Sequence, residues 1–254
     1  MNEGKTKIIY SNSENQKTVF MVFKDDITAG DGIKHDIMQG KSLIDWQINK
    51  DIYELLNKKN IPTHYIDSPE EKVCLVKKLS KKINLEVVSR RVATGSILKW
   101  EKIEEGDLFS PLVTQFHYKD DFLHDPMLSE KFINYLIKEK KSSEFAKMKE
   151  LNMQVFEILE KSFACFNIQL IDIKIEYGII DEKIYVIDEI TGGSFRLWPY
   201  LHQNPNFNQK NVLLELNPKG RLDKDTYRFG ESLDTVNSKF KEIAKITEKF
   251  KELA

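Results

Sequence analysis

The sequence predicts an α+β fold, in one large domain or two closely joined lobes, with antiparallel sheets and flanking helices. Three observations lead to this fold class. Strand-like runs come in neighbouring pairs that are joined by turn-rich clusters. Two internal segments repeat apolar residues at helical spacing, and the last 24 residues form an amphipathic helix. With 254 residues, of which 41% are hydrophobic, the chain can build a sizeable core.

The first part of the chain is mostly strands. "TKIIY" and "KTVFMVF" flank the turn-rich "SNSENQ", which predicts a hairpin. "DDITAGDGIK" is expected to be a loop, and the following helix over 41–60 carries its apolar residues at helical spacing. Those residues are Leu43, Ile48, Ile52 and Leu55. Three further strands are expected at "THYI", "VCLVKKL" and "LEVVSRRVA", with "DSPEEK" as the turn between the first two.

The second part alternates helices and strands. A helix is predicted over 144–163, with Ser142 or Ser143 as its N-cap. Strands return at "IQLIDIKIEYGI" and "KIYVIDEI". The terminal helix has its apolar face at Leu233, Val236, Phe240, Ile243, Phe250 and Leu253. We expect this face to pack against the body of the protein; binding of a partner is the alternative.

Charge and composition narrow the classes of function. The 39 basic and 40 acidic residues leave a net charge of −1, which favours neither nucleic acid nor a membrane as partner. The start "MNEGKTK" has no apolar leader and no run is long enough to span a bilayer, so we expect a cytoplasmic protein. Cys74 and Cys165 follow no metal or redox spacing and are expected to be reduced core residues. The sequence does not decide whether the protein forms a homodimer.

One strand-like segment carries a polar stripe. In "LIDIKIEYG" the side chains of Asp172, Lys174 and Glu176 share one face. If Asp181–Lys183 is a three-residue hairpin loop, Glu176 lies opposite Asp188, with the two carboxylates about 5 Å apart. A bridging hard cation would remove that repulsion, and Mg²⁺ is the usual choice beside substrate phosphates. The alternative is a plain salt bridge to Lys174.

The stretch after Asp188 adds to this picture. Glu189 can be a further metal ligand, or it can accept a hydrogen bond from a group that binds the metal. Gly192 and Gly193 allow positive φ and a close approach of the backbone to a ligand. Arg196 can hold a phosphate or carboxylate with its two-pronged guanidinium group. A metal site, a glycine loop and an anion clamp in one stretch indicate phosphoryl chemistry.

Three other motifs carry weaker signals. "EGKTK" sets Lys5 and Lys7 on one face of an extended segment, where they could cover nucleotide phosphates or lie at a solvated strand end. "VSRRVATGS" offers backbone and hydroxyl donors to an anion, but an ordinary strand end is equally consistent. "LDKDTYR" sets Lys224 and Arg228 four residues apart, on one helix face, in a loop clamp or in a charged surface turn.

Taken together, the motifs resemble the SAICAR synthetase (phosphoribosylaminoimidazole-succinocarboxamide synthase) family. The matching stretches are "EGKTKIIY", "FKDDITAGDGIK", "CLVKKL", "VVSRRVATGSILKW", "FHYKDDFLHDPM", "LIDIKIEYG", "DEITGGSFRLWP" and "LDKDTYR". The resemblance implies a two-lobed kinase-like or ATP-grasp-like fold, with a β-rich nucleotide lobe at 1–80 and an α+β lobe at 81–254. It also implies an ATP- and Mg²⁺-dependent ligase that joins a carboxyaminoimidazole ribotide (CAIR) to L-aspartate and releases ADP and phosphate.

The resemblance assigns roles to particular residues. For the nucleotide it implies Lys5, Lys7, Val76, Lys77, Leu79 and Lys119. For the ribotide it implies Asp31, Arg90, Ser96, Arg196, Lys224 and Arg228. Glu176 and Asp188 match the family's Mg²⁺ carboxylates. Lys119 matches the lysine at the transferred phosphate, and Lys119 and Lys174 are the catalytic candidates.

The chain departs from the family pattern at three places. Thr191-Gly192-Gly193 replaces a loop that usually carries an acid, which leaves the L-aspartate pocket unassigned. Arg91 and Trp100 stand where many bacterial members have Asn and Arg. Few residues precede "EGK", so the first strand is expected to be short. Two alternatives to the ligase are a small-molecule kinase and a non-catalytic nucleotide-binding protein that has decayed from such an enzyme.

Overall fold

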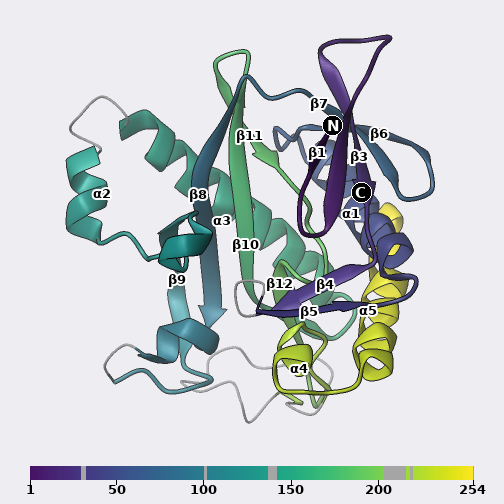
Figure 1. Cartoon of the computed structure of the whole chain (residues 1–254). Helices are drawn as coiled ribbons and strands as arrows, with labels where there is room; N and C mark the ends of the chain where they lie inside the picture. The colour runs from purple at the N-terminus through teal and green to yellow at the C-terminus, as the bar shows by residue number, and fades with distance from the viewer. Residues whose placement is uncertain (30–32, 100–101, 137–141, 203–215, 218–219, 254) are drawn as a thin grey trace.

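A computed structural model of the chain describes residues 1–29, 33–99, 102–136, 142–202, 216–217 and 220–253 (Figure 1). The first sheet has five strands in the order β1-β2-β3-β7-β6. Its strands are β1 (Asn2–Glu3), β2 (Lys7–Ser11), β3 (Thr18–Phe23), β6 (Tyr65–Glu70) and β7 (Val73–Lys77). All neighbours in this sheet pair antiparallel, and the predicted hairpin is β2 and β3.

Helix α1 (Lys41–Lys58) follows a small hairpin of β4 (Asp26–Ala29) and β5 (Lys34–Ile37). Ile48, Ile52 and Leu55 on α1 are buried, as the helical spacing predicts, whereas Leu43 is exposed. The carboxylate of Asp25 accepts from the N–H groups of Gly40 and Ser42, which caps the start of the helix.

The second sheet is built on the long strand β10 (Ile168–Ile180). β8 (Lys81–Val92) lies along one edge of β10 and carries β9 (Leu108–Tyr118) on its other side. The opposite edge of β10 is shared by β12 (Phe195–Pro199), which pairs with its first half, and β11 (Lys183–Ile187), which pairs with its second half. The chain between β11 and β12 therefore turns away from β10 at its middle, near Lys174.

Three helices complete the body. α3 (Ser142–Ala164) packs across β8 and β10, and α2 (Glu130–Leu136) lies beside it (Figure 1). α5 (Leu233–Thr247) packs against α1 and continues as a short 3₁₀ helix, Glu248–Glu252. The predicted apolar face of this terminal helix points inward, with Val236, Phe240, Ile243 and Phe250 fully buried. One apolar cluster joins side chains from both sheets and all three of α1, α3 and α5.

The hairpin of β10 and β11 corrects the predicted register by one residue. Its loop has two residues, Asp181 and Glu182, both with positive φ (46° and 62°). Glu176 therefore pairs with Ile187, and Asp188 lies beyond the end of β11. The prediction failed because the loop lacks the glycine that normally marks a two-residue turn.

Other expectations also need correction. "DDITAGDGIK" is not only a loop, since it contains β4 and the start of β5. "DSPE" continues β6, so the turn to β7 is confined to Glu71 and Lys72. Cys74 is buried as expected, but Cys165 is exposed at the end of α3. β9 and β12 were not predicted; Pro111 inside β9 hides its strand pattern.

Within the part of the chain that the structure describes, no helix is long and apolar enough to cross a bilayer.

Candidate active site

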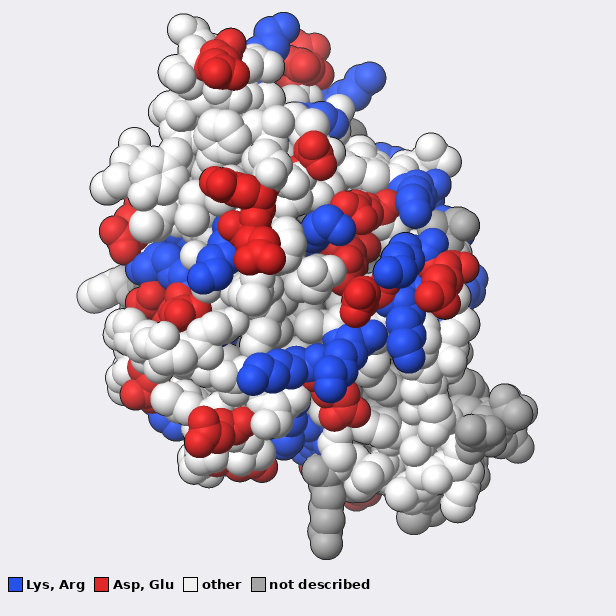
Figure 2. All heavy atoms as spheres, turned by 90° about the vertical axis from the view of Figure 1, so that its right-hand side faces the viewer, with Lys and Arg blue, Asp and Glu red and all other residues white. Residues whose placement is uncertain are grey.

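A cavity of about 750 Å³ opens between the two sheets. Its walls come from β2, β3 and β7 on one side and from β8 and β10 on the other, with the start of α1 and the segment around α4 (Asp225–Arg228) at one end. Basic and acidic side chains gather side by side across the middle of the face shown in Figure 2. A second cavity of about 570 Å³, between β8, β9 and α2, is mostly apolar.

The large cavity brings together most of the residues that the sequence singled out. Those that line it are Lys5, Lys7, Val76, Lys77, Leu79, Lys119, Lys174, Glu176, Asp188, Lys224 and Arg228. Arg90, Ser96 and Arg196 do not line it but form a neighbouring network. Asp31 lies outside the described residues.

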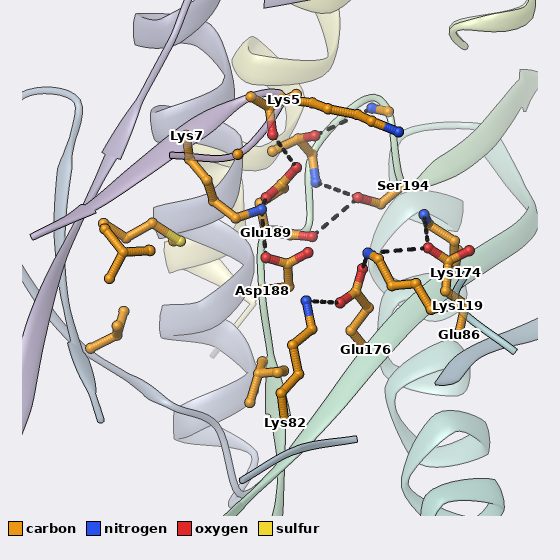
Figure 3. A pocket seen from close by; sticks show the side chains of 18 of the residues that line it. Lys5, Lys7, Lys82, Glu86, Lys119, Lys174, Glu176, Asp188, Glu189 and Ser194 are labelled. Carbon is orange, nitrogen blue, oxygen red and sulfur yellow. Dashed lines mark hydrogen bonds and ion pairs between the residues drawn. The ribbon is translucent and has the colours of Figure 1, made fainter. Parts of the chain in front are cut away.

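Lys7 connects the first sheet to the two acids after β11. Its Nζ lies 2.5 Å from Asp188 Oδ1 and also contacts Glu189, which accepts a 2.7 Å hydrogen bond from Thr6 Oγ1 (Figure 3). Burial lowers the pKa of Lys7 against the opposing pull of Asp188. Burial raises the pKa of Asp188, but Lys7 and the nearby Lys82 outweigh it and keep the pKa below its usual range. Each group thus favours the charged form of the other, against the cost of burial.

A second ionic cluster lies across β8 and β10. Lys119 contacts Glu176, whose Oε2 is 2.8 Å from Lys82 Nζ. Lys174 Nζ lies 2.7 Å from Glu86 Oε1, and Lys119 lies 3.4 Å from the same oxygen. The salt bridge expected for Lys174 thus exists, but with Glu86. Burial lowers the pKa of Lys119, yet Glu176 outweighs it and raises that pKa above its normal value.

The arginine network next to the cavity is centred on Asp172. The guanidinium groups of Arg90 and Arg196 both contact Asp172 Oδ2, the second at 2.6 Å. Arg90 also reaches Ser96 Oγ at 3.2 Å. Arg196 continues to Asp225 at 2.5 Å, and Asp225 in turn holds Arg228 at 2.6 Å. Arg90, Ser96 and Arg196 are therefore connected to the cavity wall through the Asp225–Arg228 pair.

Lys224 lies at the same end of the cavity. Burial lowers its pKa to about 7, and the nearby cations Lys41, Arg228 and Lys174 add to the effect. Such a group gains its charge when an anion arrives. This end of the cavity therefore suits a dianionic ligand group such as a phosphate.

The glycine loop behaves differently from the expectation. Neither Gly192 nor Gly193 has a φ in the left-handed region. Instead, a Cβ on Gly192 would come within 3.2 Å of three atoms of the buried Phe240 ring, so the missing side chain lets α5 approach. Left-handed φ occurs at Gly95, where the backbone passes close under Arg196.

Sequence reasoning missed several residues of the cavity wall, among them Glu86, Lys82 and His64. Glu86 and Lys82 come from β8, and the alternation that places Glu86 on the face of Arg90 was a usable signal. His64 follows α1, and burial lowers its pKa to about 4, so its imidazole is neutral at physiological pH. Nothing in the sequence around His64 connects it to this site, because its contacts are with residues far along the chain.

The carboxylates of the cavity suit a hard divalent ion. Glu176 Oε2 and Glu189 Oε2 are buried without a hydrogen-bond partner, although each faces a lysine ammonium group. Oxygen ligands of this kind fit Mg²⁺. Among the residues that the structure describes, no three His, Cys, Asp or Glu side chains are placed to hold a metal by themselves. An ion here would need further oxygens, such as those of phosphates.

Comparisons with known proteins identify the family of the chain. The SAICAR synthetase family model matches residues 1–246. The phosphoribosylaminoimidazole-succinocarboxamide synthase of Sulfurisphaera tokodaii is 39% identical over 246 residues, 96% of each chain. That of Herpetosiphon aurantiacus is 36% identical over 258 residues, 98% of this chain and 97% of the relative.

Solved structures agree as well. A SAICAR synthetase in complex with ADP superposes with a TM-score of 0.81 at 30% identity, covering 97% of this chain and 96% of the other. The phosphoribosylaminoimidazole-succinocarboxamide synthase of Ehrlichia chaffeensis gives 0.82 at 31% identity, with 98% of both chains covered. The expected α+β fold with antiparallel sheets and flanking helices is thereby confirmed, and the chain belongs to the SAICAR synthetase family.

Proposed function

We propose that this protein catalyses the ligation typical of its family and that the large cavity is its active site. The carboxylate of 5-amino-1-(5-phospho-D-ribosyl)imidazole-4-carboxylate (CAIR) is joined to the amine of L-aspartate, while ATP becomes ADP and phosphate. The observation that supports this best is the meeting of Lys7, Lys119, Glu176 and Asp188, from both sheets, in one cavity. We place the reaction in the cytoplasm, with small molecules and no nucleic acid as partners.

ATP would lie between a lobe at 1–80 and a lobe at 81–254. Ile9, Val19, Met21, Val76 and Leu79 give the cavity an apolar end that suits adenine. Lys77 N–H is already bonded to His64 O at 2.7 Å, whereas the backbone of Leu79 has no hydrogen-bond partner among the described residues. Leu79 is therefore the better backbone contact for the base. The ammonium groups of Lys5 and Lys7 would lie over the phosphates.

Glu176 and Asp188 would hold Mg²⁺, which, when bound, neutralises negative charge on the phosphates. In the ligand-free protein, Lys7, Lys82 and Lys119 balance the charge of these two carboxylates. When a nucleotide binds with its metal ion, these ammonium groups would turn to the phosphate oxygens instead. Lys119 and Lys174 lie beside the acids, where they would stabilise the transferred phosphoryl group.

The ribotide would occupy the end of the cavity near α4. Lys224 and Arg228 provide positive charge there, and Arg90, Ser96 and Arg196 form the adjacent donor network. Asp31 completes the set by family resemblance.

The chemistry would proceed in two steps. A carboxylate oxygen of the ribotide attacks the γ-phosphorus of ATP, and the bond to ADP breaks, which leaves an acyl phosphate. The aspartate amine then attacks the carbonyl carbon, phosphate departs with the electrons of the C–O bond, and the amine loses a proton. Water would hydrolyse the acyl phosphate, so the cavity must exclude water from the formation of this intermediate until the amine attacks it.

The test is ADP production by the purified protein with ATP, Mg²⁺ and CAIR, with and without L-aspartate. We expect ADP only when all four are present. Rapid ADP release without aspartate would instead identify a kinase acting on the ribotide. Bound nucleotide with no ADP formed would identify a protein that has lost the activity.

A further inference from the structure

Asp188 has a backbone conformation that is unusual for a residue other than glycine. Its φ is +70°, in the left-handed region, directly after the last residue of β11. Consecutive side chains of a strand point to opposite faces. Asp188 and Glu189 nevertheless both contact the Nζ of Lys7, because the chain turns at Asp188. The left-handed turn is therefore what directs two adjacent carboxylates into the same part of the cavity.

Two buried side chains hold that turn by its carbonyl group. Tyr53 Oη donates to the Asp188 carbonyl oxygen at 2.8 Å, and His64 Nε2 lies 3.1 Å from the same oxygen. Because the carbonyl can only accept, Nε2 of His64 must carry the proton. Both rings are buried, at 0% and 4% exposure, and their centroids are 5.4 Å apart.

The same turn is fixed on its far side. Asn49 lies one helical turn before Tyr53 on α1, and its Oδ1 accepts from the N–H of Ile190 at 3.0 Å. The backbone of His64 is itself bound to β11, since its N–H donates to Val186 O at 2.9 Å. The chain from Val186 to Ile190 is thus attached at three points to α1 and to the segment that follows it.

We propose that Tyr53 and His64 are positioning residues that fix the peptide of Asp188 so that the Asp188 and Glu189 carboxylates face the site of divalent-ion and phosphate binding. One donor would satisfy a buried carbonyl oxygen, but two donors from separate segments fix its direction as well. This inference rests on the proposed function, because it assumes that the acids serve a metal–nucleotide complex. Neither ring needs to touch substrate.

The experiment removes the donors without removing the rings. Tyr53→Phe loses only the hydroxyl group. His64→Met loses the donor at Nε2, whereas His64→Gln keeps an N–H at a similar reach. Tyr65→Phe is the matched control, because Tyr65 is also buried and stacks on Tyr53 at 5.7 Å, but its hydroxyl group faces Glu54.

Each variant is examined by Mn²⁺ titration in the presence of ADP, followed by electron paramagnetic resonance, and by ADP titration in EDTA. We expect Tyr53→Phe and His64→Met to raise the dissociation constant of Mn²⁺ about tenfold. Losing a residue that orients a metal ligand usually has an effect of this size. The ADP dissociation constant in EDTA should stay within twofold of the wild type. His64→Gln should recover most of the Mn²⁺ affinity, and Tyr65→Phe should bind like the wild type.

Several outcomes would overturn the inference. Unchanged Mn²⁺ affinity in both Tyr53→Phe and His64→Met would show that the carbonyl donors do not position the acids. Equal losses of Mn²⁺ and metal-free ADP binding, or a loss of Mn²⁺ affinity in Tyr65→Phe, would indicate a general packing effect. A wild type that binds ADP but no Mn²⁺ would remove the proposed metal site itself, which distinguishes that failure from the failure of the positioning role.

Discussion

The low pKa of Lys224 should lead to a measurable uptake of a proton when a ligand binds. Burial, reinforced by the charges of Lys41, Arg228 and Lys174, lowers the pKa of Lys224 from 10.5 to about 7. This difference corresponds to about 5 kcal/mol against the charged form in the ligand-free protein, as an upper limit. A ribotide phosphate beside the ammonium group would restore the charge and return the pKa toward its usual value.

The size of the effect follows from the pKa. At pH 8, a group with a pKa of about 7 is only about 10% protonated, so charging it fully on binding takes up about 0.9 proton. The phosphate of the ribotide is already a dianion at that pH and contributes little. We expect this uptake in calorimetric titrations of CAIR, without ATP, in two buffers of different ionisation enthalpy. Lys224→Met should abolish the uptake, and Lys183→Met, exposed at the start of β11, should preserve it.

The same shift has a consequence for stability. Between pH 7 and 10.5 the unfolded chain binds a proton at Lys224 that the folded protein does not, so the free energy of unfolding should rise with pH across this window. In Lys224→Met that rise should be smaller. Tight binding of CAIR by the wild type at pH 8 with no proton uptake would refute the reasoning, because Lys224 would then be charged already or remote from the phosphate.

The remaining predictions concern the metal acids, the arginine network and the glycine loop. Glu176→Gln and Asp188→Asn should each reduce turnover at least a hundredfold while circular dichroism stays native, because each removes a carboxylate that Mg²⁺ needs; near-normal turnover of both at saturating Mg²⁺ would contradict the metal assignment. Arg196→Ala should raise the CAIR dissociation constant at least tenfold and leave that of ADP unchanged, since it removes the donor that joins Asp172 to Asp225; equal CAIR affinity would exclude Arg196 from this role. Gly192→Ala should destabilise the protein by about 1–3 kcal/mol in thermal denaturation, because the new methyl group overpacks the Phe240 ring, whereas Gly193→Ala, with its nearest neighbours at 3.7 Å, should not.

Local patterns in the sequence predicted most of the elements and the chemical class of the site. Alternation in β10 places Asp172, Lys174 and Glu176 on one face, and all three take part in the ionic clusters. Helical spacing identifies α1, α3 and the buried face of α5. These features are local, because the period of a strand or helix is set by residues a few positions apart. The eight motifs in their order also pointed to the family that the comparisons confirm.

How the acids are held depends on contacts between segments that are far apart along the chain. The position of Asp188 depends on a two-residue hairpin without glycine and on hydrogen bonds from Tyr53 and His64, which are 135 and 124 residues away along the chain. The partner of Lys174 is Glu86 from the neighbouring strand, which the period of β10 cannot reveal. Gly192 is explained by the ring of Phe240, not by its own backbone angles. Periodicity fixes the direction of a side chain relative to its own element, but its partner depends on how the elements pack, and that is settled by contacts distributed over the whole chain.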